Sequence, residues 1–244
     1  MKLFITSSPY VENADRAILN EDNGFVERLR SALPDNPRAL FICSDPDSHD
    51  LTCHWGADTV AAFSLANMAF SSYHVLDGTN AEDAEFLIDN ADFIVTGGGH
   101  VPTQNAFFQD IHLRELLENF DGVVMGISAG SMNLADTVYV QPEEEGEGID
   151  PEFERFAPGL GLTDVNILPH YQKVKDNILD GMRLFEDITY ADSMGNTFFA
   201  LPDGSYFYQD EESLILCGEG YLLRDGELSP LTERGEELNM EDFE

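Results

Sequence analysis

The feature that most limits the fold of this chain is an alternation of short apolar runs with longer segments of helical periodicity. Short, continuously apolar runs are typical of strands buried on both faces of a sheet. The expected strands are Lys2–Ser7, Ala39–Cys43, Tyr73–Leu76, Phe93–Thr96 and Gly122–Ile127. The expected helices between them are Asn20–Leu33, Thr52–Phe70, Ala81–Asn90 and Thr103–Asn119. This order predicts an α/β fold in which helices cover both faces of a mostly parallel sheet.

The rhythm changes after Val138. We expect further strands at Val138–Gln141 and Asn166–Leu168, a helix at Ile178–Phe185, and hairpin-type strands at Phe198–Tyr208 and Leu214–Leu223. The sequence contains no internal repeat and no stretch that resembles an interdomain linker. A single domain over residues 1–244 is therefore the expected organisation.

The charge balance excludes several classes of partner. The chain has 47 acidic residues and 12 lysines and arginines, which gives a formal net charge of −35. With 43% hydrophobic residues it can still form a core, so disorder is not expected. Too few cations are present for a track that binds nucleic acid or an anionic membrane. Three widely spaced cysteines predict neither disulfides nor a thiolate zinc site, and we expect a cytoplasmic protein.

The motif with the clearest chemical meaning is Gly126-Ile127-Ser128-Ala129-Gly130, which fits the pattern G-x-S-x-G. It follows an apolar strand and precedes a helical segment, which is the context of a nucleophile elbow. A sharp turn there would expose the Ser128 hydroxyl and direct the N–H of Ala129 toward a developing oxyanion. A plain strand-to-helix turn with a surface serine is the alternative interpretation.

Two further motifs could complete a hydrolytic site around Ser128. Gly97-Gly98-Gly99 follows the preceding strand, so its backbone is expected beside the elbow. A simple glycine-rich turn and a phosphate-binding loop are the alternative interpretations of this triglycine. His170 comes at the end of the apolar run Val165–Leu168, where an expected strand ends, and is the best candidate for a general base. His100, next to the triglycine, is the second candidate.

The carboxylate that should orient the base is ambiguous in the sequence. The acidic stretch at Glu143, Glu144, Glu145 and Glu147 follows an expected strand, and one of these residues could face His170. Asp136 is a weaker choice. An acidic loop near Asp45 fits no metal-ligand spacing, so we expect no metal and no cofactor.

Taken together, these motifs resemble the serine peptidases that include peptidase E, an aspartyl dipeptidase, and more distantly cyanophycinase. The resemblance covers most of the chain and depends mainly on the serine elbow and on Leu168-Pro169-His170-Tyr171. It implies a three-layer α/β/α fold similar to class I glutamine amidotransferases. It also implies Ser128 as nucleophile and His170 as base.

The same resemblance implies an oxyanion hole and a third catalytic residue. The backbones of Gly98 and Ala129, with Gly99 beside them, would form the oxyanion hole. The acid would be Glu143 or Glu144, where peptidase E has an aspartate. His100 replaces an asparagine of peptidase E after the triglycine, which could change the substrate pocket.

Peptidase E cleaves dipeptides that begin with aspartate, so the resemblance implies a cation near the site. Lys173 and Lys175 follow His170 closely, and Arg183 lies beyond them. They would suit an anionic substrate, but pairing with nearby carboxylates on an exposed turn is an equally good interpretation.

We therefore expect a serine exopeptidase that acts on small peptides, with Asp-X dipeptides as substrates. A non-catalytic or ligand-sensing protein of the amidotransferase-like fold is the alternative, as is a serine hydrolase of different peptide specificity. An ordinary α/β-hydrolase esterase is disfavoured because Ser128 and His170 are too close in sequence. For the oligomeric state, a homodimer is one of the options.

Overall fold

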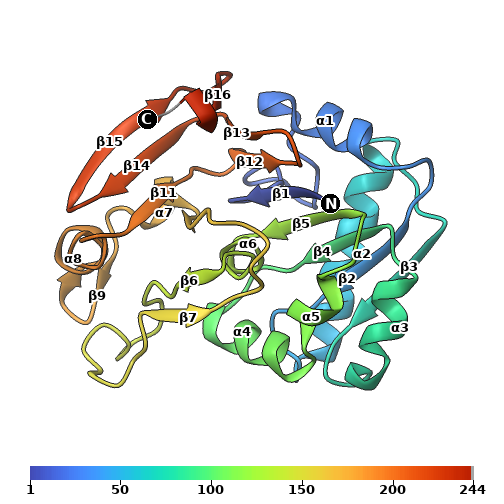
Figure 1. Ribbon diagram of the computed structural model, residues 1–244, viewed down its shortest axis with the longest axis horizontal. Coiled ribbons are helices and arrows are strands. Elements are labelled where there is room, and N and C mark those ends of the chain that lie inside the picture. Colours follow the sequence, from blue (N-terminus) through green and yellow to red (C-terminus); the bar gives the residue numbers. More distant parts are fainter. Residues whose placement is uncertain (243–244) are drawn as a thin grey trace.

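The computed structural model describes residues 1–242, and a central eight-stranded sheet organises it (Figure 1). The strand order is β16-β13-β12-β1-β5-β4-β2-β3. The parallel part consists of β1 (Lys2–Thr6), β5 (Val123–Ile127), β4 (Phe93–Thr96), β2 (Arg38–Ile42) and β3 (Ser72–Leu76). The antiparallel part consists of β12 (Tyr206–Gln209), β13 (Leu214–Cys217) and β16 (Glu237–Asn239). The expected parallel strands are thus confirmed to within a residue or two.

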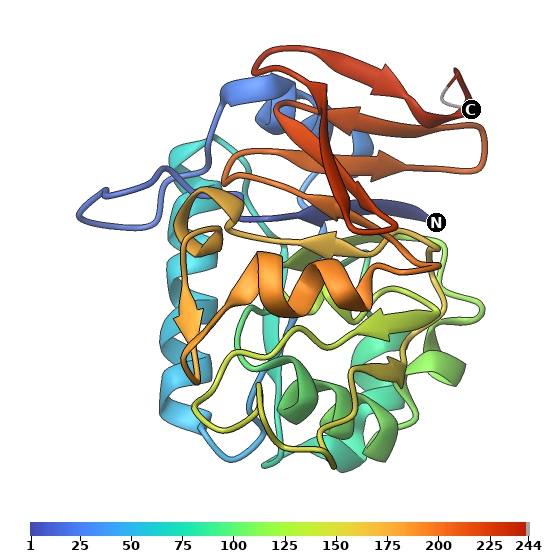
Figure 2. The same ribbon diagram turned by 90° about the vertical axis from the view of Figure 1, so that its left-hand side faces the viewer.

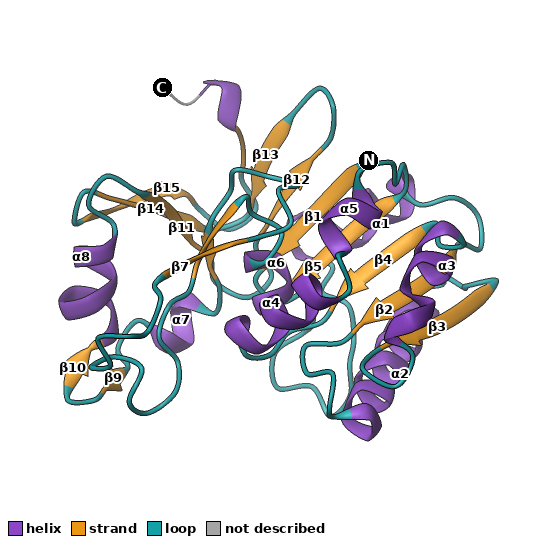
Figure 3. Cartoon of the chain, turned by 60° about the horizontal axis from the view of Figure 1, so that its bottom comes forward, coloured by secondary structure: helices purple, strands orange, loops and turns teal. Residues whose placement is uncertain are grey.

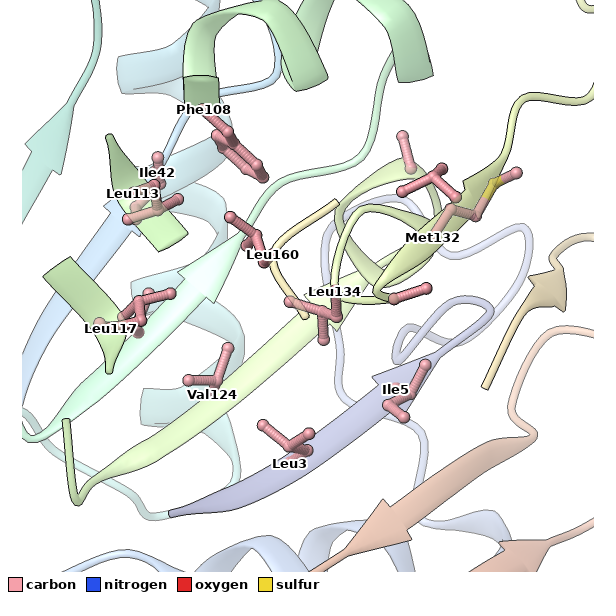
Figure 4. Close-up of a cluster of buried hydrophobic side chains, with 14 of the residues drawn as sticks. Leu3, Ile5, Ile42, Phe108, Leu113, Leu117, Val124, Met132, Leu134 and Leu160 are labelled. Carbon is pink, nitrogen blue, oxygen red and sulfur yellow. The ribbon is translucent and has the colours of Figure 1, made fainter. Parts of the chain in front are cut away.

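Helices cover both faces of this sheet. On one face lie α1 (Phe25–Ala32) and α2 (His49–Leu65), and on the other lie α3 (Ala84–Asp89), α4 (Val101–Asp110), α5 (Leu113–Leu117) and α6 (Ala129–Met132). Alternate residues of one strand belong to the two cores, since Phe4 packs with α1 whereas Leu3 and Ile5 pack on the other side. Figure 4 shows the second of these cores, to which Leu3 and Val124 contribute from the strands and Leu117 from α5. The predicted three-layer α/β fold is confirmed.

A second sheet packs beside the first and carries the later part of the chain (Figure 3). Its order is β15-β14-β11-β8, formed by β15 (Glu227–Thr232), β14 (Gly220–Arg224), β11 (Thr197–Ala200) and β8 (Ile167–Leu168). The pair β11 and β8 is parallel, with Ala200 opposite Leu168. A third core lies under this sheet and includes Tyr139, Phe185 and Phe198. The sheet therefore brings the ends of β8 and β11 to the same edge.

Several expected elements differ from the structure. The helix expected at Ile178–Phe185 is instead a hairpin of β9 (Ile178–Leu179) and β10 (Met182–Arg183), followed by a π-helix at Leu184–Thr189. Asp180 and Gly181 both have positive φ, 53° and 82°, which is the conformation of a two-residue hairpin turn. This Asp-Gly turn overrides the helical periodicity of the apolar residues around it.

Three other expected segments are divided. The segment Thr103–Asn119 is two helices, because His112, with φ 53°, separates α4 from α5. The segment Phe198–Tyr208 is likewise two strands in different sheets, β11 and β12, joined by a turn. The segment Leu214–Leu223 is also divided, between β13 in the first sheet and β14 in the second. A short antiparallel pair, β6 (Thr137–Tyr139) and β7 (Phe156–Pro158), lies beside the second sheet. None of the helices formed by residues 1–242 has the length and apolar character needed to cross a membrane.

Candidate active site

Ser128 stands in the tight turn between β5 and α6, at the carboxyl edge of the parallel sheet. Its backbone is strained, with φ 51° and ψ −114°. Its N–H donates to the carbonyl oxygens of Thr6 and Ser7, at 3.1 and 3.2 Å, so the end of β1 fixes this conformation. The turn therefore presents the serine hydroxyl as a nucleophile elbow does.

The two glycines of the motif are required by close packing. A Cβ atom at Gly126 would lie 2.5 Å from Cα of Ser131, and one at Gly130 would lie 2.2 Å from the carbonyl oxygen of Thr96. Contacts this short do not occur for real side chains, so a larger residue would push α6 away from the sheet. The spacing G-x-S-x-G is thus explained by how closely the helix approaches β4 and β5.

His170 lies two residues beyond β8, in a left-handed conformation with φ 57°. Its Nε2 atom is 2.9 Å from Oγ of Ser128, and its Nδ1 atom is 2.6 Å from Oδ1 of Asp203. This series of contacts, from hydroxyl to imidazole to carboxylate, is the arrangement of a serine-hydrolase triad. The structure thus brings together the predicted Ser128 and His170, with an acid that the sequence analysis did not name.

Asp203 is held as an anion by several donors. Its side chain is only 6% exposed, and it accepts hydrogen bonds from Ser7 Oγ at 3.0 Å and Lys173 Nζ at 2.6 Å. Burial alone would raise its pKa. The pKa is nevertheless held well below the ordinary value by the hydrogen bond and charge of His170 and by the hydrogen bonds from Lys173 and Ser7. Ser7 Oγ also accepts from the backbone N–H of His170, at 2.7 Å, so it links both residues.

The glutamates expected to orient His170 form no hydrogen bond with it within residues 1–242. Within residues 1–242, the carboxylate hydrogen-bonded to Nδ1 of His170 is that of Asp203, and neither Glu143 nor Glu144 takes this place. Both glutamates instead donate their backbone N–H groups to Oε2 of Glu147, at 2.7 and 2.9 Å. Their prediction as the third member of the triad is corrected by this geometry. The weaker choice, Asp136, pairs with Arg114 instead.

The oxyanion-hole candidates lie around the serine. A Cβ atom at Gly98 would be 3.4 Å from Cβ of Ser128, so the triglycine does lie beside the elbow. Gly99 and Ala129 line the same cavity as Ser128. In the described part of the chain no hydrogen bond uses the N–H of Gly98, Gly99 or Ala129. These donors are therefore available to a substrate oxygen.

The cavity at the serine has a volume of about 200 Å³. Ser128 and His170 line it together with Gln141, Glu143 and Asn177, and the remainder of its wall is largely apolar, from Val101, Met132, Val174, Ile178, Leu179 and Leu184. This volume is below the roughly 300–1,000 Å³ of a drug-sized pocket. The site is thus suited to one small acyl group.

The three predicted substrate cations do not line this cavity. Lys173 binds Asp203 and, at 3.3 Å, Glu12, while Nζ of Lys175 lies 6.0 Å from the ring centre of Tyr171. Arg183 forms a paired contact with Asp187 on the surface. As far as residues 1–242 are concerned, no lysine or arginine contributes to the cavity wall.

His100 likewise serves the surrounding loop rather than the cavity wall. Its Nδ1 atom is 2.8 Å from Thr103 Oγ1, and its Nε2 atom is 3.0 Å from Oε1 of Glu147. His100, Glu144 and Glu147 offer ligand-type atoms within 4.8 Å of one another, which is close enough for a cation. However, Glu147 already accepts two backbone N–H groups and the contact from His100, so internal hydrogen bonds account for this cluster.

Comparison with known proteins gives the family. The sequence profile described as peptidase family S51 matches residues 3–217, nearly the whole chain. The chain belongs to peptidase family S51. It is a serine-type peptidase of the peptidase E group, as the resemblance in sequence implied.

A solved structure supports the fold in particular. The crystal structure of a candidate peptidase E protein from Listeria monocytogenes EGD-e is similar with a TM-score of 0.59 at 15% sequence identity. The match covers 95% of this chain and 98% of the other. No curated protein matches the chain in sequence.

Proposed function

We propose that the protein is an exopeptidase that hydrolyses short peptides through an acyl-enzyme on Ser128. The observation that carries this proposal is the continuous contact from Ser128 Oγ to His170 Nε2 at 2.9 Å and from His170 Nδ1 to Asp203 at 2.6 Å. The family supports a serine peptidase, and the triad geometry supports a working nucleophile.

The reaction uses each group in turn. His170 Nε2 accepts the Ser128 proton as Oγ bonds to the peptide carbonyl carbon, and the N–H groups beside the elbow stabilise the resulting oxyanion. His170 then gives this proton to the departing amine, which leaves an ester on Ser128. A water molecule, deprotonated by the same imidazole, hydrolyses the ester and restores the serine. Asp203 keeps the proton on Nδ1, so Nε2 remains the acceptor.

The cavity supports the restriction to short peptides and bears on their first residue. Its volume of about 200 Å³ leaves room for one acyl residue beside Ser128. The resemblance to peptidase E implied an N-terminal aspartate. Lys173 and Arg183 are paired with carboxylates, and none of the three predicted cations lines the cavity, whose wall is largely apolar. We therefore propose a small, uncharged first residue as the preferred substrate and Asp-X as the alternative to be measured.

A dipeptide panel tests this function. The wild-type protein and Ser128→Ala are compared on X-Leu dipeptides with alanine, valine or aspartate as the first residue. We expect wild-type turnover, with loss of at least about 1,000-fold in Ser128→Ala. Equal turnover by both proteins would refute the role of Ser128. A protein that neither hydrolyses peptides nor reacts with a fluorophosphonate would instead be the ligand-sensing alternative.

A further inference from the structure

Glu143 is a carboxylate without a protein partner in the same cavity as the nucleophile. It is the acidic residue among those that line this cavity, within the part of the chain that the structure describes. Across residues 1–242, no hydrogen bond or ion pair involves its side chain. Glu143 is exposed to solvent, and a ligand seated in the cavity would displace part of the water around its carboxylate. A bound ligand therefore restores what this carboxylate loses in hydration only if it brings a positive group of its own.

The loop that carries Glu143 is fixed from one side by Glu147. Oε2 of Glu147 accepts the backbone N–H groups of Glu143 and Glu144, and Oε1 contacts His100 at 3.0 Å. Glu147 is held ionised: burial opposes this, but the two N–H groups and His100 lower its pKa. The backbone of Glu143 is thus bound to the start of α4, which follows the triglycine.

The same loop is fixed from the other side by two further residues. The carboxylate of Asp180, in the β9–β10 turn, accepts the N–H groups of Gly146 and Gly148, both at 2.9 Å. Arg155 donates to the carbonyl oxygens of Glu147 and Gly148, at 3.3 and 3.2 Å. These contacts hold Glu143 in place before any substrate arrives, which is what a binding residue needs.

The charges near Glu143 are in keeping with a ligand of positive charge. Partial desolvation raises its pKa, the neighbouring Glu147 and Glu144 raise it further, and His100 and His170 oppose the change. A cation bound in the cavity would replace the lost hydration and offset the repulsion from both glutamates.

We propose that Glu143 binds the free α-ammonium group of the substrate's first residue. This inference rests on the proposed function. In a peptide cleaved after its first residue, the ammonium is attached to the carbon next to the scissile carbonyl. A carboxylate that recognises it must therefore share the small cavity with Ser128, as Glu143 does. The apolar wall would then hold the first side chain, so the site selects an aminoacyl group with a free amine and an uncharged side chain.

A matched pair of substrates and a matched pair of variants test this assignment. The substrates are alanine p-nitroanilide and its N-acetyl derivative, which differ in the ammonium group. The variants are Glu143→Gln and Glu145→Gln, because Glu145 is an exposed residue of the same loop that does not line the cavity. The labelling rate with an uncharged fluorophosphonate reports the reactivity of Ser128 without an amine.

We expect Glu143→Gln to lower kcat/KM for the free amine by about 10- to 100-fold, as for a charged hydrogen bond. The fluorophosphonate labelling rate of Glu143→Gln should match that of the wild type. The ratio of its activity on the free substrate to that on the acetylated substrate should be smaller than in the wild type. Glu145→Gln should behave as the wild type in all of these measurements. Unchanged kcat/KM in Glu143→Gln, with active wild type, would overturn this inference alone. Slow labelling in Glu143→Gln would also overturn it, because Glu143 would then act on Ser128. A wild type that is neither labelled nor active would overturn the proposed function itself.

Discussion

Asp203→Asn is the substitution that most directly tests the triad. The carboxylate accepts hydrogen bonds from His170 Nδ1, Ser7 Oγ and Lys173 Nζ, at 2.6, 3.0 and 2.6 Å. An asparagine keeps the shape but removes the charge that stabilises a protonated imidazole. Its amide can also donate to Nδ1, which would move the imidazole proton to Nε2 and block the acceptor that Ser128 needs.

The magnitude follows from what the structure removes. The same change in another serine protease triad lowers kcat by about 10,000-fold, which corresponds to about 5.5 kcal/mol of transition-state stabilisation at 1.36 kcal/mol per factor of ten. Asp203 is nearly fully buried, like the acid in that triad, so solvent would not replace the lost charge. We therefore expect a loss of about 1,000- to 10,000-fold in kcat.

Fluorophosphonate labelling and dipeptide hydrolysis measure this effect, and Glu144→Gln is the matched control. Both readouts should fall together in Asp203→Asn, while Glu144→Gln labels at the wild-type rate. Circular dichroism and thermal unfolding establish that each variant is folded. Labelling of a folded Asp203→Asn within tenfold of wild type would refute the assignment of Asp203. Loss of labelling in Glu144→Gln with retention in Asp203→Asn would restore the acid expected from the sequence.

Other predictions follow from the same contacts. Lys173→Met should slow labelling by at most about fivefold, because a half-exposed ion pair contributes about 1 kcal/mol or less, whereas Lys175→Met should have no effect. Gly130→Ala should lower the free energy of unfolding by about 1–3 kcal/mol or more, measured by urea denaturation, because its Cβ would overlap the Thr96 carbonyl. The lowered pKa of Asp203 adds stability that is present above its unfolded pKa of about 3.9 and is lost as the pH falls toward the folded value. The free energy of unfolding of Asp203→Asn should therefore vary less with pH below about 5 than that of wild type.

The sequence predicted the parts of the site that depend on local patterns. Ser128 is recognised because a G-x-S-x-G elbow needs small residues at fixed offsets, and the structure shows the overlaps that require them. The triglycine is placed correctly because β4 and β5 are neighbours in a parallel sheet. These inferences use only residues near each other in sequence and the regular order of parallel strands.

Asp203 was not predicted because its position depends on the pairing of two strands that are far apart in the sequence. It follows β11 in a Pro-Asp-Gly turn, and His170 follows β8, with Ala200 opposite Leu168 in a parallel pair. Parallel neighbours end at the same edge, so the side chains of Asp203 and His170 meet there, and His170 in turn reaches Ser128. If Phe198–Tyr208 is taken as one hairpin-type strand, the turn after Leu201 is not recognised, and Asp203 then has no place at the edge of the sheet.

Closeness in sequence also misled the interpretation of Lys173 and Lys175. Residues two apart on a helical turn point to different sides. The short helix α7 (Tyr171–Val174) directs Lys173 to Asp203, whereas Lys175, just after its end, lies over the ring of Tyr171. The lysine next to the base thus serves the triad acid. Ser7 was missed for a similar reason, since its Ser-Ser-Pro turn shows no chemistry until β1 is placed beside β5.

The net charge of −35 gives an independent way to examine substrate charge. At neutral pH an Asp-X dipeptide carries a net negative charge, and an Ala-X dipeptide carries none. The field of so acidic a protein repels anions over about 10 Å at 0.1 M salt but only about 3 Å at 1 M. If the active enzyme uses Asp-X, kcat/KM should rise with salt as this repulsion is screened, beyond any change seen with Ala-X. Because general effects of salt on the fold act on both substrates alike, the ratio of their kcat/KM values isolates the electrostatic part. A ratio that does not change with salt would mean that the surface charge does not reach the cavity, and that the lining residues alone set the preference.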